Sequence, residues 1–167
     1  MSIRVADLPP ILEEIIVRVR QDAAPMAARA MAEQFQVNVK ARLGAMGHFL
    51  HTKTPSPPGN PPAWISRNLL GSVDIGPFAY GGDGAAWECH SALVYSAIQE
   101  FGGDMTAHSD RGMRWQEPPG VWHRSMAHSL PERSYFGSTT DIMLADGQFE
   151  EAAVRGFLAA DIFAGLG

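Results

Sequence analysis

A proline-rich segment in the middle of the chain constrains the fold more than any other feature. Residues 53–62 read KTPSPPGNPP and contain five prolines and one glycine. Proline has no backbone amide to donate and restricts the residue before it, so this segment can form neither a helix interior nor a central strand. We call residues 48–63 the proline strap and expect it to be extended and solvated.

An apolar stretch follows the strap directly. It reads WISRNLLGSV, contains Trp64, Leu69 and Leu70, and is expected to make one helical turn that leads into a strand. In that strand Val73 and Ile75 alternate with polar residues, which is the period of a half-buried strand. This stretch is therefore expected to anchor the strap in the core.

The overall composition fits one globular domain spanning residues 1–167. The chain is 46% hydrophobic, and its net charge of −5 argues against broad nucleic-acid binding, which needs a basic face. Cys89 is the only cysteine, so no disulfide can form within the chain. The N-terminus lacks the uninterrupted apolar region of a signal peptide, and no run approaches the ~20 apolar residues that span a bilayer. We therefore expect synthesis in the cytosol and no membrane contact.

Both ends of the chain are predicted to be helical. In residues 1–47, Asp7 can cap a helix, and apolar residues then recur at helical spacing. A second segment is expected to start near Pro25, although the two could also form one long kinked helix. Residues 138–167 are expected to hold an amphipathic helix with the apolar stripe Phe149, Ala153, Phe157, Ala160 and Phe163.

The middle of the chain, residues 64–137, is predicted to form the sheet. After a return strand near residues 85–91, a short helix is expected in residues 94–103. Residues 104–120 are polar and are interrupted by glycine and proline, which is typical of an exposed loop or of the tip of a long hairpin. A further strand and a turn, PERSYFGSTTD, complete the region. This order predicts an α+β fold, a small antiparallel β-sheet packed by the long N-terminal helical region and the C-terminal helix.

The sequence gives little support for catalysis. His48 and His51 are three residues apart and could present two imidazoles to a metal, but no third ligand is near them. Cys89 and His90 are adjacent, so in a strand they point to opposite faces and make a poor catalytic pair. No phosphate-binding loop, serine elbow or zinc spacing is present. We expect no catalytic residue, no cofactor and no metal.

A local basic bias marks the region after residue 104. Three histidines share it with four arginines, the residues being His108, Arg111, Arg114, His123, Arg124, His128 and Arg133. This group could bind a carboxylate-rich partner or phosphate, or it could be the solvated face of a hairpin. Trp115 and Trp122 flank the sequence QEPPG. They could form an exposed contact tip or pair across a hairpin stem.

Three segments, in order, resemble motifs of the neck and tail-completion proteins of long-tailed bacteriophages. The first, PPGNPPAWISRNLLGSV, is similar to the family's Pro-Gly-x-Pro-Pro opening and the leucine turn after it, with matches at Pro58, Gly59, Pro61, Pro62, Leu69 and Leu70. VYSAIQEFGG resembles its Tyr-to-Glu-Phe-Gly segment at Tyr95, Glu100, Phe101 and Gly102. LPERSYFGST resembles its arginine turn at Pro131, Arg133 and Phe136. Ser134 stands where the family has a second proline, and the loop at 104–120 is long.

The resemblance implies a structural virion protein and not an enzyme. The subunits are expected to form a closed ring, sixfold in our prediction, at the head–tail junction, where it completes the tail or joins it to the head. Its partners would be copies of itself and neighbouring neck and tail proteins, first in the host cytoplasm and then in the virion. DNA can pass through such a ring without sequence-specific binding.

The resemblance also assigns roles to individual segments. The strap is expected to lie along a neighbouring subunit at low entropic cost, because its prolines are already restricted when unbound; the alternative is an ordinary crossover loop. Glu100 and Arg133 are expected to be structural and to pair with each other. The loop at 104–120, with Arg111, Arg114 and Trp115, is the best candidate for a contact with the head or tail side.

Two other functions remain open at this point. One is a tail-terminator protein, which caps the tail tube and does not bridge it to the head. The other, from a different class, is a small metal-dependent or hydrolytic enzyme that uses the histidines.

Overall fold

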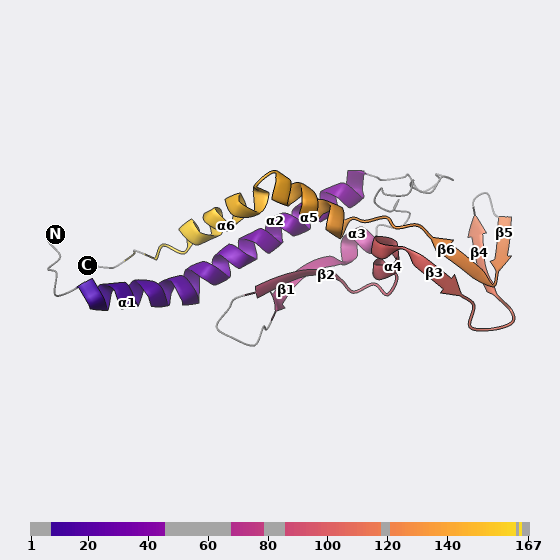
Figure 1. Cartoon of the computed structure of the whole chain (residues 1–167), viewed down its shortest axis with the longest axis horizontal. Coiled ribbons are helices and arrows are strands. Elements are labelled where there is room, and N and C mark those ends of the chain that lie inside the picture. Colours follow the sequence, from indigo (N-terminus) through magenta and orange to yellow (C-terminus); the bar gives the residue numbers. More distant parts are fainter. Residues whose placement is uncertain (1–7, 46–67, 79–85, 118–120, 163, 165–167) are drawn as a thin grey trace. The chain divides into compact units, whose positions relative to one another are not determined.

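The computed structural model describes residues 8–45, 68–78, 86–117, 121–162 and 164. Its chain divides into two compact units that interleave along the sequence. The first unit comprises residues 1–36, 75–89 and 143–167, and the second comprises residues 37–74 and 90–142. Figure 1 labels the helices and strands in chain order. The fold class is α+β, as the sequence predicts.

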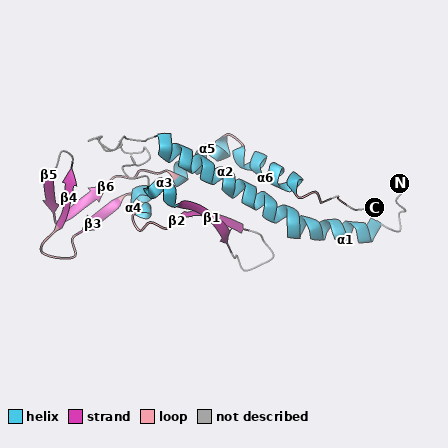
Figure 2. Ribbon diagram, turned by 180° about the vertical axis from the view of Figure 1, so that it is seen from behind, coloured by secondary structure: helices cyan, strands magenta, loops and turns pink. Residues whose placement is uncertain are grey.

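A continuous helical run begins the described chain. It consists of α1 (Leu8–Arg18), a π-helical segment η2 (Val19–Ala23) and α2 (Ala24–Ala45). The alternative of one long helix, in place of two segments, is therefore confirmed: Pro25 lies inside α2, and Figure 2 shows the ribbon continuing from α1 into α2. Because proline has no amide to donate, regular bonding cannot pass through this residue unchanged. The π-helical segment just before it absorbs the irregularity, with the amide of Ala24 donating to the carbonyl of Val19.

In the first unit, α6 (Gln148–Ala159) packs closely against the first half of α2. Its contact side carries Ala152 and Gly156, both of which are buried. The rings of Phe35 and Phe149 lie 5.9 Å apart between centroids, and Arg155 donates to Gln34 over 2.9 Å. Small residues on α6 therefore allow the two backbones to approach, and larger side chains flank the contact.

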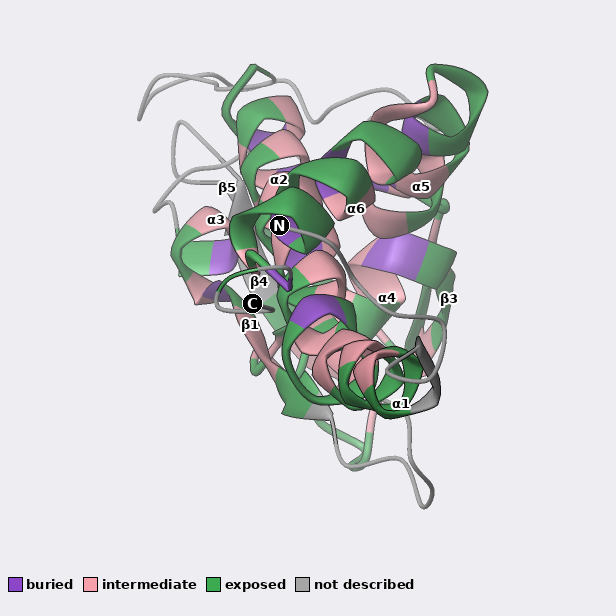
Figure 3. Ribbon diagram, turned by 90° about the vertical axis from the view of Figure 1, so that its left-hand side faces the viewer, coloured by how far each residue is buried: buried purple, intermediate pink, exposed green. Residues whose placement is uncertain are grey.

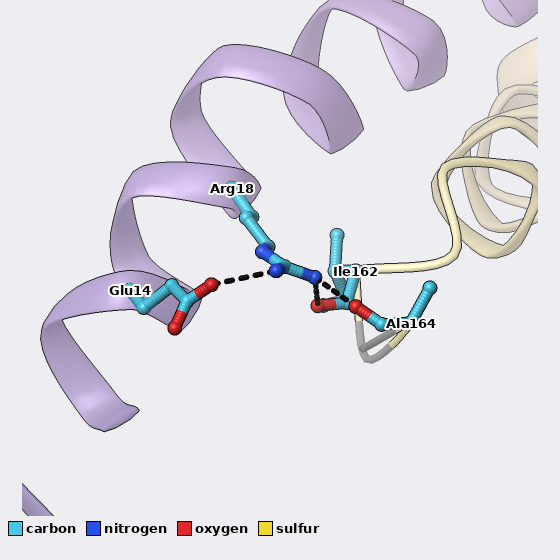
Figure 4. A network of polar contacts seen from close by, with 4 residues as sticks. All are labelled: Glu14, Arg18, Ile162 and Ala164. Atoms are coloured by element: carbon cyan, nitrogen blue, oxygen red, sulfur yellow. Dashed lines mark hydrogen bonds and ion pairs between the residues drawn. The ribbon is translucent and has the colours of Figure 1, made fainter. Parts of the chain in front are cut away.

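The segment after α6 is tied to the beginning of the chain by Arg18. One guanidinium nitrogen, Nη1, donates to the carbonyls of Ile162 and Ala164, as Figure 4 shows. The other, Nη2, donates to Glu14 on the preceding turn of α1 over 2.6 Å. A cation beside the carbonyls that follow the end of a helix is favourable, because no helical amide donates to those carbonyls.

The strands form three two-stranded sheets in the described residues, where the sequence predicts one small sheet. The pairs are β1 (Val73–Phe78) with β2 (Ala86–Ser91), β3 (Gly103–Thr106) with β6 (Ala127–Leu130), and β4 (Met113–Glu117) with β5 (Val121–Ser125). The one-turn helix α3 (Asn68–Ser72) precedes β1, as expected. Its Ser72 hydroxyl lies 2.7 Å from that of Ser91, at the end of β2.

Two further predictions about the second half of the chain are corrected. The stretch expected as a turn at residues 131–141 contains the start of α5 (Phe136–Ala145). The expected single C-terminal helix is two helices, because Gly147 between α5 and α6 has a φ of 69°, a left-handed conformation that glycine adopts readily. Residues 104–120 are not one loop. They hold most of β3, a turn and β4, so the alternative of a long hairpin is confirmed.

Among the described residues, few apolar side chains are buried. The fully buried ones include Tyr135, Leu43, Met143, Val39 and Val73. Large apolar side chains are exposed on several helices, and Figure 3 shows broad exposed surfaces on α1 and α6. Among the described residues, then, the core is modest relative to the apolar surface left outside it.

We predict that Gly156→Ala destabilises the first unit. A Cβ at this position would lie 2.7 Å from the Ala27 Cα and 2.8 Å from the Ala30 Cβ, and it would also meet the Met26 carbonyl. Overpacking of this kind costs about 1–3 kcal/mol, against a helix-propensity gain of at most ~1 kcal/mol. Urea unfolding should therefore give a net loss of stability. Gly71→Ala is the matched control, because a Cβ there meets nothing within 4 Å, and it should be neutral or stabilising.

Candidate functional site

The carboxylate of Glu100 joins α4 (Ser96–Phe101) to the start of α5. Its Oε1 accepts hydrogen bonds from the Ser134 hydroxyl and the Gly137 amide, each over 2.8 Å. Its Oε2 accepts from the amides of Tyr135 over 2.8 Å and Phe136 over 3.0 Å. Amides at the first turn of a helix have no helical acceptor, so the carboxylate caps α5 from a distant segment. Because a carboxylate has about four acceptor positions, the four donors satisfy it.

This cap explains how a charged side chain can be buried. Glu100 is only 6% exposed. Burial acts to raise the pKa of its carboxyl, but the hydrogen bonds from Gly137, Tyr135, Phe136 and Ser134 outweigh that effect and the net pKa is lowered from 4.5. The N-terminus of α5 also carries positive dipole charge, which favours the ionised form. Nearby, burial together with the charge of Glu100 raises the pKa of Tyr135 to about 12.

The first turns of α5 carry a row of hydroxyls and have low helix propensity. Ser138, Thr139 and Thr140 each donate to the carbonyl four residues earlier, over 2.8, 2.6 and 3.0 Å. The Ser134 hydroxyl, which donates to Glu100, also accepts from the Ser138 amide over 3.1 Å. Serine and threonine normally compete with helical bonding in this way, so the external cap is needed to fix where the helix begins.

Close backbone contact completes the junction around Glu100. Gly102 has a φ of 66°, and a Cβ there would lie 2.6 Å from the Glu132 amide nitrogen. The amide of Arg133 donates to the Gln99 carbonyl over 3.0 Å. Strands β3 and β6 leave this point together, with Gly103 opposite Leu130. The junction is therefore the root of a long two-stranded extension.

The structure brings some of the residues predicted for this region together, but with different partners. Glu100 contacts the Phe136 amide, and the Phe136 ring lies 4.8 Å from that of Tyr135. All four donors that the structure assigns to the carboxylate come from residues 134–137, at the start of α5, so the expected partner Arg133 is not one of them. Tyr95 and Phe101 are exposed.

The remaining predicted site residues lie apart from this junction. Leu69 is buried and Leu70 half-buried in α3. Pro58, Gly59, Pro61, Pro62 and Trp64 of the strap lie outside the described residues, as do His48 and His51. Arg111 and Arg114 lie on the extension that begins at the junction, and so does Trp115.

The far part of this extension is the β4–β5 hairpin. Its register places Arg114 opposite Arg124 and Gln116 opposite Trp122, so Arg114, Trp122 and Arg124 lie on one face. Trp115 lies opposite His123, so the two tryptophans are not cross-strand partners and the stem-pairing alternative is wrong. Arg111 precedes β4 in the turn from β3.

Arginines gather around one tryptophan on this hairpin. Arg111, Arg114, Trp122, His123 and Arg124 line a surface hollow of about 360 Å³. The Arg114 guanidinium lies 5.8 Å from the centroid of the Trp122 ring, and the Arg124 Nη2 donates to the Asp110 carbonyl over 2.7 Å. We call Arg111, Arg114, Trp122 and Arg124 the arginine hairpin. None of its three guanidiniums forms an ion pair with a described carboxylate.

Chemically, this hollow suits a carboxylate or phosphate ligand. Guanidinium groups bind such anions in a planar, bidentate manner. Trp122 is 63% exposed, so it can add apolar contact beside the charges. Two like charges directly opposite each other on a hairpin are unfavourable for the isolated subunit. The arrangement therefore lowers the stability of the hairpin while it places three guanidiniums around one exposed hollow.

Membrane and metal chemistry receive no support from the described residues. In these parts of the chain no helix is long and apolar enough to cross a bilayer. Likewise, no group of three or more histidine, cysteine, aspartate or glutamate side chains within them could hold a metal ion. Cys89 is half-buried.

Glu100→Gln should weaken the fold and change its response to acid. The amide keeps one acceptor but turns an NH₂ group toward backbone amides, so we expect a loss of about 1.5–3 kcal/mol at neutral pH. Because folding lowers the pKa of Glu100, its ionised form stabilises the protein above pH 4.5, and that stability is lost as the pH falls through the folded-state pKa. Urea unfolding at several pH values measures both effects.

The control for this experiment is Glu132→Gln, at an exposed carboxylate in the same region. It should unfold like the wild type at every pH. If the wild type and Glu100→Gln proteins lose stability in parallel between pH 6 and 3, the cap does not stabilise the fold.

A double-mutant cycle should reveal repulsion between Arg114 and Arg124. We expect an unfavourable coupling of about 0.2–1 kcal/mol when Arg114→Ala, Arg124→Ala and the double variant are compared with the wild type. The cycle separates this pair from the Trp122 and Asp110 contacts that each single change also removes. The coupling should shrink in high salt, since these groups are exposed. A favourable coupling would contradict the cross-strand arrangement.

Comparison with known proteins adds no relative to this description. No protein-family model, no curated protein and no solved structure matches the chain.

Proposed function

We propose that this chain is a structural virion protein at the head–tail junction of a long-tailed phage, where copies form a closed ring that completes the tail or joins it to the head. The proposal rests on the three sequence segments that resemble neck and tail-completion proteins. It is supported by the way two of those segments, around Glu100 and around Phe136, meet in one buried hydrogen-bonded junction.

An exposed apolar patch beside that junction carries the ring part of the proposal. Val94 is 98% exposed, Tyr95 43% and Phe101 76%. Val94 and Tyr95 immediately precede α4 and Phe101 ends it, so these exposed apolar side chains lie at the two ends of the short helix that carries the buried Glu100 carboxylate. Such patches are typical of contact surfaces between proteins. A neighbouring subunit would remove them from water.

Further exposed apolar side chains lie on the long helices of the first unit. Leu12 and Ile16, one turn apart on α1, are 54% and 51% exposed. Val154 and Leu158, one turn apart on α6, are 57% and 71% exposed. A ring of identical subunits uses two different surfaces of each copy, because its contacts are heterologous and close by rotation. Separate patches on the two units fit that requirement.

The ring is tested directly by the mass of the purified protein. Light scattering and native mass spectrometry should give a closed oligomer of the 18.1-kDa chain, six copies in our prediction. Electron microscopy of the sample should show an annulus, and an image of the particle would place it between head and tail or at the tail end. A protein that stays monomeric at high micromolar concentration would refute the ring proposal.

The proline strap provides a second test of assembly. Deletion of residues 55–62 should leave a folded subunit, because prolines contribute no ladder or helix bonds, but should weaken the oligomer if the strap ties neighbours together. Circular dichroism measures the fold, and the concentration dependence of the mass measures assembly. An unfolded subunit, or an oligomer of unchanged stability, would contradict the tie.

A further inference from the structure

The arginine hairpin presents positive charge that forms no ion pair with the side chains that the structure describes. Arg111, Arg114 and Arg124 surround an exposed indole, and none of them has an ion-pair partner among the described side chains. The chain as a whole carries a net charge of −5, so the charge of this cluster is opposite in sign to that of the chain. An arginine pair that is held together without a bound anion costs stability. An anion bound between the guanidiniums would offset this repulsion.

A surface of opposite character lies on α6 of the first unit. Glu150 and Glu151 in its first turn and Val154 and Leu158 further along are all exposed. At 100° per residue these four positions span an arc of about 100°. They lie on the side away from Ala152 and Gly156, which are buried against α2. We call these four residues the α6 acidic face.

The two surfaces match in both charge and apolar content. The arginine hairpin has three guanidiniums beside one indole, and the α6 acidic face has two carboxylates beside two aliphatic side chains. Carboxylates can pair with the guanidinium forks in bidentate geometry. Trp122, at 63% exposure, and Leu158, at 71% exposure, could cover each other.

We propose that the arginine hairpin of one subunit docks on the α6 acidic face of a second copy of this chain. The inference rests on the proposed ring, in which each subunit offers different surfaces to its two neighbours. It names one pair of those surfaces and the chemistry that joins them. It also reassigns residues 104–120, for which the sequence suggests a contact with the head or tail side.

Nucleic acid is the less favoured occupant of the hairpin. Double-stranded DNA is bound mainly through many phosphate contacts, and three arginines on a protein of net charge −5 provide few of them. A second copy of the chain brings carboxylates and apolar groups in the combination that the hairpin presents. DNA binding by the hairpin is therefore one outcome that the test can reveal.

The test reverses charge on one surface at a time in the full-length protein. The hairpin variant is Arg111→Glu/Arg114→Glu, which leaves the Arg124 bond to Asp110 in place. The face variant is Glu150→Lys/Glu151→Lys. We expect each to weaken assembly at least about tenfold, measured by the concentration at which the oligomer dissociates. Arg111→Lys/Arg114→Lys keeps the charge and should assemble more strongly than the reversed hairpin variant.

Mixing the two variants gives the decisive result. In a ring where they alternate, every reversed hairpin meets a reversed face and every native hairpin meets a native face. An equimolar mixture should therefore regain assembly to within about threefold of the wild type, whereas each variant alone does not. This rescue also shows that both variants are folded, because unfolded chains could not complement each other.

The outcomes separate this inference from the proposed function. A wild-type protein that never oligomerises refutes the ring. A wild-type oligomer that the reversed hairpin leaves unchanged refutes the docking contact alone, and loss of binding to duplex DNA by that variant would assign the hairpin to nucleic acid. Rescue in a single chain carrying all four changes, without rescue in the mixture, would place the contact within one subunit and overturn the proposal.

Discussion

The second unit depends on one buried charge. The Glu100 carboxylate reaches across 34 to 37 residues of sequence to four donors at the start of α5. A buried carboxylate without partners would be very costly, so the fold is tolerable only while all four donors stay in place. The same bonds determine where α5 begins, because its hydroxyl-rich first turns do not favour a helix by themselves. The Glu100 side chain therefore holds the two ends of the long intervening segment together and also determines where α5 begins.

The geometry of the extension follows from this closure. The chain leaves the junction at Gly103 and returns at Leu130, and between these points it forms two successive antiparallel strand pairs. Gly102 permits the approach, since no larger residue fits against the Glu132 amide. A two-stranded ribbon is only marginally stable without such support. The fixed root therefore allows an otherwise weak hairpin to hold its arginines away from the core of the unit.

Local patterns in the sequence predict much of this fold. The N-terminal helical run, α3, β1, β2 and α4 all lie where periodicity and the Gly102 stop place them. The sequence pattern does not predict which strands pair when the partners are far apart in the chain. One sheet is predicted and three strand pairs are found, because alternation identifies strands but not their partners. The start of α5 is missed because Ser138, Thr139 and Thr140 interrupt its apolar period.

The candidate site is predicted in part for the same reason. Arg111 and Arg114 stand out as interface residue types, and the local basic bias includes Arg124. The sequence cannot show that Arg124 faces Arg114, because that depends on which residues of β4 and β5 pair. For Glu100, the expected partner is the nearest residue of opposite charge in the matching motif. The backbone amides at the start of a helix satisfy a carboxylate equally well, but they carry no side-chain charge by which a sequence pattern could identify them.

Two features of the isolated subunit work against its own stability, and both point outward. Arg114 lies opposite Arg124, and Val94 and Phe101 are exposed beside a well-ordered junction. In natural proteins, local choices usually agree with the global fold, and departures concentrate at sites used for something other than folding. A neighbouring subunit that supplied carboxylates to the hairpin and apolar surface to α4 would remove both penalties. In the proposed assembly a neighbouring subunit would therefore relieve both unfavourable features, whereas the buried Glu100 cap is already satisfied within one chain and would gain nothing from a partner.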